Sequence, residues 1–254
     1  MTETDGPVIA VVQARMTSTR FPGKVMKALA GAPLVRRTVE RVARIEGIDH
    51  VVVALAEGAA NDVVATAFDG LDVSVIRGPE QDVLARTAAA ARAAGAGTVV
   101  RISSDCPLVD PLASAGVVAA FKACRAGGVR YARMAFDQGF PLGFDTEAVA
   151  ASALYEAEAA ATDRYEREHV TPYIWRRPDR YPVVILSSQP DRRSWRLVVD
   201  TEADYRLIST VYDALYPANP NFGYRELCQL FAASPDLLQI NSDVEQNAYV
   251  GRRY

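Results

Sequence analysis

Residues 8–24 read V-I-A-V-V-Q-A-R-M-T-S-T-R-F-P-G-K, and this stretch decides the fold class. Its apolar, β-branched beginning is typical of a strand buried in a parallel sheet. The loop that follows carries three cations, Arg15, Arg20 and Lys24, and Pro22-Gly23 predicts a turn just before the lysine. Forked arginines, a lysine ammonium and backbone N–H groups at a turn are the donors that a triphosphate needs. A solvated surface loop with scattered charge is the alternative that this stretch alone leaves open.

Two familiar phosphate-binding motifs are absent. No G-x-x-x-x-G-K-[ST] occurs, and no G-x-G-x-x-G follows the first strand. The stretch R-x-x-S-x-R-x-P-G-K therefore predicts neither a P-loop nor a dinucleotide fingerprint.

Length and composition bound the class of protein. With 254 residues, half of them hydrophobic, the chain suffices for one large α/β domain or two small ones. We expect a single domain over 8–240, with a flexible segment at 1–7 and an arm at 241–254. The formal net charge of -3 argues against a protein that coats nucleic acid, so no nucleic-acid partner is expected.

The termini and the cysteines indicate the compartment. The first residues are acidic rather than signal-like, and no apolar run reaches membrane-spanning length. Cys106, Cys124 and Cys228 are odd in number and lack metal-ligand spacing, which indicates reduced thiols. A cytoplasmic protein with no membrane partner is expected.

Helical and strand-like patterns alternate through the first half of the chain, which is the pattern of a doubly wound parallel sheet. Strands are expected at 8–12, 50–55, 72–76 and 98–102, and helices at 34–45, 61–68, 83–94 and 110–125. Beyond 125 the pattern loosens, and we expect strands at 129–134, 183–186 and 195–199 and helices at 152–161, 201–215 and 224–232. The segment 140–147 reads as a turn-rich stretch with two acids.

Carboxylates stand at the ends of two expected strands far apart in the chain. Asp105 follows the strand at 98–102, and Asp200 follows the one at 195–199. Strand-end carboxylates are hard oxygen ligands that suit Mg²⁺, and two of them are able to share one ion or a pair of ions. Each aspartate has an alternative reading as a helix cap, although Asp110-Pro111 already provides a start signal for the helix after Asp105.

Two further segments leave a functional and a structural reading open. The loop with Arg77 and Asp82 follows a strand at the sheet edge where ligands bind, but it also reads as an ordinary turn with Asp82 as a helix cap. The charged run 163–173 reads as a solvated helix face with an Asp163–Arg167 pair. Alternatively, its residues Arg167, Glu168 and His169 line an acceptor pocket.

An ordered set of motifs resembles a known family. The motifs are Q-A-R-M-T-S-T-R-F-P-G-K, R-G-P-E-Q-D-V-L-A-R, R-I-S-S-D-C-P-L-V-D-P, G-F-D-T-E, R-E-H-V-T-P-Y and V-D-T-E-A-D-Y. In this order they resemble the cytidylyltransferase-like proteins related to spore-coat polysaccharide biosynthesis protein F, and more distantly the CMP-sialic acid and CMP-Kdo synthetases. The resemblance implies a three-layer α/β/α fold with a mostly parallel, mixed central sheet, the glycosyltransferase-A-like nucleotidyltransferase fold.

The resemblance also implies roles for individual residues. The residues expected to act directly in catalysis are Lys24, Arg15 and Asp105, and the ligands of Mg²⁺ would be Asp105 and Asp200. The nucleotide would contact Gln13, Ala14, Arg15, Ser18, Arg20, Lys24, Arg77, Asp82 and Ser104. The acceptor would contact Asp145, Glu147, Arg167, Glu168 and His169. A homodimer is expected.

The implied activity is transfer of CMP from CTP to a small anionic acceptor with release of pyrophosphate. One alternative is a glycosyltransferase that uses a preformed nucleotide sugar, because Asp145-Thr146-Glu147 resembles a metal-binding D-x-D. Another is a non-catalytic nucleotide-binding subunit. The sequence leaves open the choice of base and whether the acceptor is an acidic sugar, a sugar phosphate or another small acid.

Overall fold

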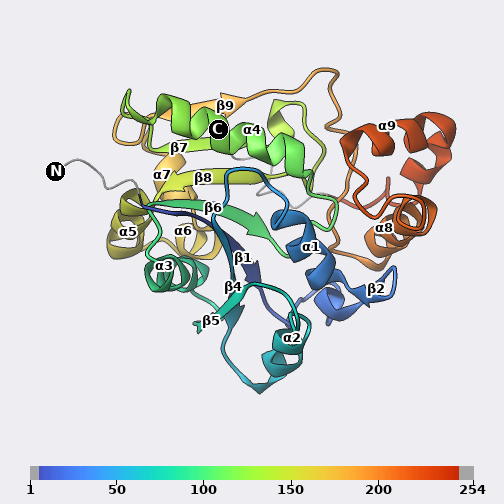
Figure 1. Ribbon diagram of the computed structural model, residues 1–254, viewed down its shortest axis with the longest axis horizontal. Coiled ribbons are helices and arrows are strands. Elements are labelled where there is room, and N and C mark those ends of the chain that lie inside the picture. Colours follow the sequence, from blue (N-terminus) through green and yellow to red (C-terminus); the bar gives the residue numbers. More distant parts are fainter. Residues whose placement is uncertain (1–5, 246–254) are drawn as a thin grey trace.

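Strand β1 (Val8–Ala14) lies in the middle of a seven-stranded sheet in a computed structural model that describes residues 6–245 (Figure 1). The strand order is β5-β4-β1-β6-β8-β7-β9. The other strands are β4 (His50–Ala56), β5 (Ser74–Gly78), β6 (Thr98–Ser103), β7 (Tyr131–Met134), β8 (Thr146–Ala150) and β9 (Val183–Leu186). Only β8 runs antiparallel to its neighbours within this sheet. The expected mostly parallel, mixed sheet is confirmed.

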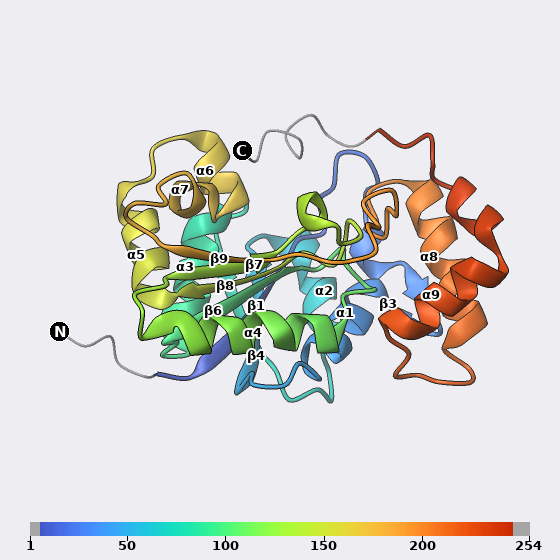
Figure 2. The ribbon, with the colours of Figure 1, turned by 90° about the horizontal axis from the view of Figure 1, so that it is seen from above.

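Helices cover both faces of the sheet (Figure 2). The α1 and α4 helices lie on one face, where Lys122 of α4 donates to the carbonyl of Gly47 beyond α1. The α3 and α5 helices pack against each other on the opposite face. Their bounds are α1 (Leu34–Val42), α3 (Val83–Ala93), α4 (Pro111–Arg125) and α5 (Ala151–Ala160). Because both faces are covered, β1 and β4 are almost uniformly apolar and buried rather than alternating.

Shorter and later elements complete the layers. They are β2 (Ala28–Leu29), β3 (Ala32–Pro33), α2 (Asp62–Thr66), α6 (Arg164–His169), α7 (Pro172–Trp175), α8 (Glu202–Leu215) and α9 (Tyr224–Ala233). In Figure 1, α8 and α9 lie together beside α1 and β2. The hydroxyl of Tyr205 in α8 donates to the carbonyl of Ala28 in β2 at 2.6 Å, which joins the end of the chain to its beginning.

The expected strand at 195–199 is wrong. This segment is buried, but its backbone makes only one isolated bridge, between Arg196 and Leu142. Its N–H groups donate to loops instead, from Leu197 to the Leu142 carbonyl and from Val199 to the Asp105 carbonyl. Conversely, 146–150 is a sheet strand, β8, where the sequence predicted a turn-rich stretch over 140–147.

The ends of the expected domain are only partly described. Residues 1–5 of the predicted flexible segment and 246–254 of the predicted arm lie outside the described residues. Asn241, at the start of that arm, is buried, and its amide donates to the Arg196 carbonyl and to Asp204. Over 6–245, no helix combines the length and the apolar character that a bilayer crossing requires.

Candidate active site

A cavity of about 390 Å³ opens where β1 and β6 end. The carboxyl ends of neighbouring parallel strands meet at one edge of a sheet, so the loops after β1 and β6 both contribute to it. Twelve of the residues proposed from the sequence line this cavity. They are Gln13, Ala14, Arg15, Ser18, Arg20, Lys24, Ser104, Asp105, Asp145, Glu168, His169 and Asp200.

A buried asparagine, Asn61, fixes the start of the loop after β1. Asn61 is 1% exposed; its side-chain oxygen accepts from the N–H of Met16 at 2.7 Å, and its amide donates to the Glu57 carbonyl. Asn61 therefore supports the cationic loop and provides no side-chain cap to α2. At the other end of the loop Gly23 has a φ of 71°, a left-handed conformation that glycine adopts without steric cost. The expected Pro22-Gly23 turn is confirmed, and it sends Lys24 into the cavity.

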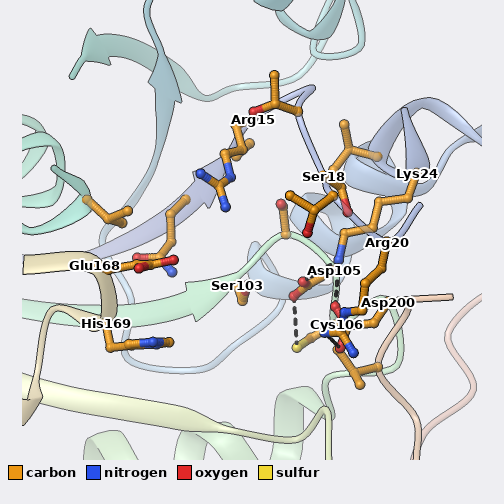
Figure 3. A pocket seen from close by; sticks show the side chains of 18 of the residues that line it. Arg15, Ser18, Arg20, Lys24, Ser103, Asp105, Cys106, Glu168, His169 and Asp200 are labelled. Carbon is orange, nitrogen blue, oxygen red and sulfur yellow. Dashed lines mark hydrogen bonds and ion pairs between the residues drawn. The ribbon is translucent and has the colours of Figure 1, made fainter. Parts of the chain in front are cut away.

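Lys24 joins carboxylates from two distant segments. Its ammonium lies 2.8 Å from Asp105 and 2.9 Å from Asp200, and it also donates to the Val199 carbonyl at 2.6 Å (Figure 3). Burial by itself lowers the pKa of Lys24, but the two carboxylates outweigh burial and raise the pKa above its ordinary value. Burial raises the pKa of Asp105, but the Lys24 ammonium outweighs it and keeps that pKa below its ordinary value. Lys24 and Asp105 are therefore both charged at neutral pH.

Asp200 is fixed by several donors. Arg20 from the first loop and Arg196 contact the same carboxylate oxygen at 2.9 and 3.0 Å. Arg196 in turn pairs with the fully buried Asp204, whose carboxylate also accepts from the N–H of Asp200. The helix-cap reading belongs to the next residue, because Thr201 caps α8 in a reciprocal capping box with Asp204. Asp105 is not a cap either, since Asp110 caps α4.

The donor set at this end of the cavity fits a hard divalent cation. Asp105 and Asp200 come from different segments and already converge on one positive charge, Lys24 Nζ. No group of three or more Asp, Glu, His or Cys side chains within 6–245 is arranged to hold a metal. Two carboxylates without a complete protein cage are typical of Mg²⁺ sites that substrate phosphates and water complete.

The opposite end of the cavity carries Arg15, Glu168 and His169, whose side chains extend toward its centre in Figure 3. Glu168 and His169 come from the end of α6, where Val170 has a φ of 73°. A left-handed β-branched residue is strained, and Val170 is completely buried, so packing holds the chain in this turn.

Arg101 lines the cavity although the sequence did not single it out. It lies in β6, and its guanidinium donates to Gln13 in β1 and to Glu147 in β8. Glu147 also accepts from the hydroxyls of Tyr131 and Thr171, and it is 7% exposed. Glu147 thus orients Arg101 and lies outside the cavity lining, whereas the sequence predicted that Glu147 would contact the acceptor.

Three other predicted site residues do not line the cavity. Arg77 pairs with Asp62 at the surface. Asp82 accepts from the N–H of Ala85 at 2.9 Å, so the helix-cap reading applies to it. Its second oxygen pairs with Arg167 at 2.6 Å, so the predicted Asp163–Arg167 pair is replaced by a contact between α6 and the start of α3. This ion pair joins α3 to α6, the helix that carries Glu168 and His169.

The sequence reasoning also missed Arg86, Ser103 and Cys106, which line the cavity. Arg86 belongs to the alanine-rich α3, and its place at the end of the motif R-G-P-E-Q-D-V-L-A-R was the signal that could have identified it. It is 2% exposed and donates to the Pro79 and Glu80 carbonyls; burial and the nearby Arg15 lower its pKa to about 10. Burial raises the pKa of the Cys106 thiol, and Asp105 adds to that effect, so Cys106 is a protonated donor to Asp105 rather than a nucleophile.

Comparisons with known proteins identify the family of this chain. Residues 9–222 match the family described as Cytidylyltransferase. Spore coat polysaccharide biosynthesis protein SpsF of Bacillus subtilis is 30% identical over 245 residues, which is 90% of this chain and 95% of that protein. A 3-deoxy-manno-octulosonate cytidylyltransferase of an Anaeromyxobacter species is 37% identical over 131 residues, about half of each chain.

A solved structure has the same architecture. The structure of a cytidylyltransferase from Leptospira borgpetersenii superposes with a TM-score of 0.86 at 27% identity, covering 92% of this chain and 97% of the other. The family match spans β1, the cationic loop, β6 and the segment that carries Asp200. This chain therefore belongs to the cytidylyltransferase family, as its motifs predicted.

Proposed function

We propose that this protein transfers CMP from CTP to a small anionic acceptor, with release of pyrophosphate and with Mg²⁺ as cofactor. One observation carries the proposal: cations from the loop after β1 and carboxylates from two distant segments meet in one cavity, around Lys24 Nζ. Membership of the cytidylyltransferase family supports the choice of CTP. The names of the relatives suggest an acidic sugar or a related surface-polysaccharide precursor as the acceptor.

Some of the lining residues bind the triphosphate, and others stabilise the charge on its phosphates. Arg15, Arg20 and Lys24 hold the triphosphate, and Ser18 and Ser104 offer hydroxyl groups to it. Lys24 has three acceptors within 2.9 Å, which place its ammonium at this end of the cavity, and one of them has to be exchanged for a phosphate oxygen when the triphosphate binds. Asp105 and Asp200 hold Mg²⁺, which neutralises phosphate charge when bound. The acceptor oxygen attacks the α-phosphorus in line, and pyrophosphate leaves without a covalent protein intermediate.

Glu168 and His169, at the other end of the cavity, contact the acceptor. Arg101 lies on the sheet between the two ends, oriented by Gln13 and Glu147. Asp145 also lines the cavity, and its carboxylate accepts from the N–H of Gly143, whose φ of 104° is a conformation that glycine adopts readily. The glycosyltransferase alternative is disfavoured, because Glu147 is occupied by Arg101, Tyr131 and Thr171 and is not available as a second metal ligand.

The test is CTP-dependent release of pyrophosphate in the presence of Mg²⁺ and a panel of sugar acids, sugar phosphates and phosphonates. Release with at least one acceptor, lost in Asp105→Asn while circular dichroism is unchanged, is the expected result. Formation of a free nucleoside diphosphate from a nucleotide sugar would instead identify a glycosyltransferase. A thermal-shift series with CTP, GTP, UTP and ATP checks the base, because the preferred nucleotide raises apparent stability most.

We also propose that the protein is a cytoplasmic homodimer. The free state of all three cysteines is compatible with a reducing compartment. Sedimentation equilibrium of the purified chain measures the dimer directly, and a monomer at micromolar concentration would contradict it.

A further inference from the structure

A second cavity, of about 210 Å³, lies between α1 and α8 and shares no lining residue with the first. Arg37 and Arg41 of α1 and Arg44 just after it follow one another at four- and three-residue spacing, so they stand on one face of the helix. Like charges at this spacing destabilise a helix unless something compensates them. The other lining residues are Glu40, Tyr212, Tyr216, Pro220 and Asn221.

The single carboxylate in this lining is already shared. Glu40 accepts from Arg36 at 3.0 Å and from Arg37 at 2.7 Å. Arg37 also donates to the Leu29 and Ala30 carbonyls, and its guanidinium stacks on the Tyr216 ring at 4.4 Å. Arg37 therefore has hydrogen-bond acceptors within the protein. Glu40 pairs with Arg36 and Arg37, and among residues 6–245 it forms no ion pair with Arg41 or Arg44.

Arg41 is an incompletely paired buried cation. It is 3% exposed; its Nε donates to the Val109 carbonyl at 2.8 Å and its Nη1 to the Phe222 carbonyl at 3.0 Å. Its Nη2 is buried without any hydrogen-bond acceptor among residues 6–245. The Phe222 ring lies 4.8 Å from this guanidinium. Burial lowers the pKa of Arg41 and outweighs the Asp110 carboxylate, which acts to raise that pKa without forming an ion pair with Arg41. An unmet buried hydrogen-bond donor is costly.

Arg44 adds a second positive charge beside Arg41. It is half-buried, and within the described part of the chain its guanidinium donates one hydrogen bond, to the neutral side-chain oxygen of Asn221, and forms no ion pair. We infer that this second cavity binds a small tetrahedral oxyanion, either inorganic phosphate or the phosphate group of a small monoester. Such an anion supplies the negative charge that Arg41 and Arg44 lack, and guanidinium groups match phosphate oxygens in geometry.

Occupancy of this cavity is linked to the active-site loop. Arg41 holds the Val109 carbonyl, and the hydroxyl of Tyr212 donates to the Pro107 carbonyl at 2.7 Å. Both carbonyls belong to the segment that directly follows Asp105. An anion that fixes Arg41 therefore stiffens the loop that carries a carboxylate of the first cavity.

Crystals of the full chain soaked in tungstate, a tetrahedral dianion with a strong anomalous signal, test the site directly. We expect a peak between α1 and α8 in contact with the arginines, lost in Arg44→Gln and retained in Arg206→Gln. Arg44→Gln removes only the contact with Asn221, so the fold is expected to survive. Arg206 is an exposed arginine of α8 outside the cavity lining and serves as the matched control.

Calorimetry and hydrogen exchange complete the test in solution. Inorganic phosphate and glycerol phosphate are titrated separately; affinity at this site falls about tenfold or more in Arg44→Gln, and tighter binding of glycerol phosphate identifies a monoester as the ligand. Exchange of the amides of Cys106, Leu108 and Val109 slows with phosphate in the wild type and in Arg206→Gln but not in Arg44→Gln. Absence of a tungstate peak between α1 and α8, or a peak indifferent to Arg44→Gln, overturns the inference. Neither readout uses nucleotide turnover, so the inference stands or falls independently of the proposed reaction.

Discussion

At one end of the first cavity Lys24, Asp105, Asp200 and Arg20 are bound to one another, whereas at the other end Arg15 makes no hydrogen bond or ion pair among residues 6–245. At the first end the charged side chains are already paired with one another. A triphosphate therefore has to replace some of these pairs when it binds. The second end offers a cation that is not yet engaged. Arg15 on the one hand and Arg20 and Lys24 on the other, although encoded in one ten-residue loop, should therefore respond differently to mutation.

The comparison separates stability from binding. Changes at the paired end leave a charge without its partner, so they affect the free energy of unfolding as well as activity. Changes at Arg15 remove no contact within the described protein, so they affect ligand binding alone.

The largest effect is expected for Lys24→Ala. Removal of the ammonium takes away the transition-state charge stabilisation and leaves Asp105 facing Asp200 with one cation fewer, so CTP-dependent pyrophosphate release should fall about 1,000-fold or more. Unfolding in urea should also show a loss of stability. Lys27→Ala is the matched control, because Lys27 is exposed and its ammonium lies over the face of the Phe21 ring, outside the cavity lining. Equal activity of the two variants would remove Lys24 from the mechanism.

Arg15→Ala is expected to rank second. A charged hydrogen bond to phosphate is worth about 1.5–3 kcal/mol, so kcat/KM for CTP should fall about 10- to 100-fold. The urea midpoint should stay at the wild-type value, in contrast to Lys24→Ala. Arg164→Ala, an exposed arginine of α6 outside the cavity lining, should change neither quantity. A marked loss of stability in Arg15→Ala would show that this end is also preorganised.

The third prediction uses pH to isolate the Lys24–Asp105 pair. The folded pKa of Asp105 is depressed below 3.8, so its contribution to stability is present above the unfolded pKa and is lost as pH falls through the folded value. The folded pKa of Lys24 is raised above 10.5, so its contribution is present below 10.5 and is lost as pH rises through the folded value. In Asp105→Asn the stability deficit should therefore be largest near neutral pH and shrink in acid.

Urea denaturation between neutral pH and pH 3 measures this deficit. Asp179→Asn changes an exposed aspartate in the turn after α7 and controls for the general effect of one charge. A deficit that is constant across the whole range would mean that Asp105 titrates as it does in the unfolded chain.

Sequence reasoning predicted one end of the cavity better than the other for a physical reason. Lys24, Asp105 and Asp200 stand in loops next to apolar elements, and the carboxyl-end rule for parallel sheets brings such loops together. Even so, the strand expected before Asp200 does not form, because its N–H groups donate to loop carbonyls. Burial and position were predicted there, but the hydrogen-bond pattern was not.

The other end depends on strand register and on contacts between distant segments. Arg101 contacts Gln13 and Glu147 because β1, β6 and β8 lie side by side, and β8 itself was not predicted. Asp82 meets Arg167 across 85 positions of sequence. A local motif shows that such residues are charged, but it does not show which of them turn toward each other and away from the ligand.

The smallest effect is expected for Arg77→Ala, which tests this distinction at a residue that the family resemblance assigns to the nucleotide. Arg77 is 37% exposed, and its partner Asp62 is 66% exposed, so the pair contributes no more than about 0.5 kcal/mol. Because Arg77 does not line the cavity, kcat/KM for CTP should stay within twofold, roughly, of the wild-type value. Steady-state kinetics and urea denaturation of the same preparation measure both quantities. A tenfold rise in KM for CTP would mean that nucleotide binding draws the end of β5 toward the cavity, since only that movement brings Arg77 away from Asp62 and into contact with the ligand.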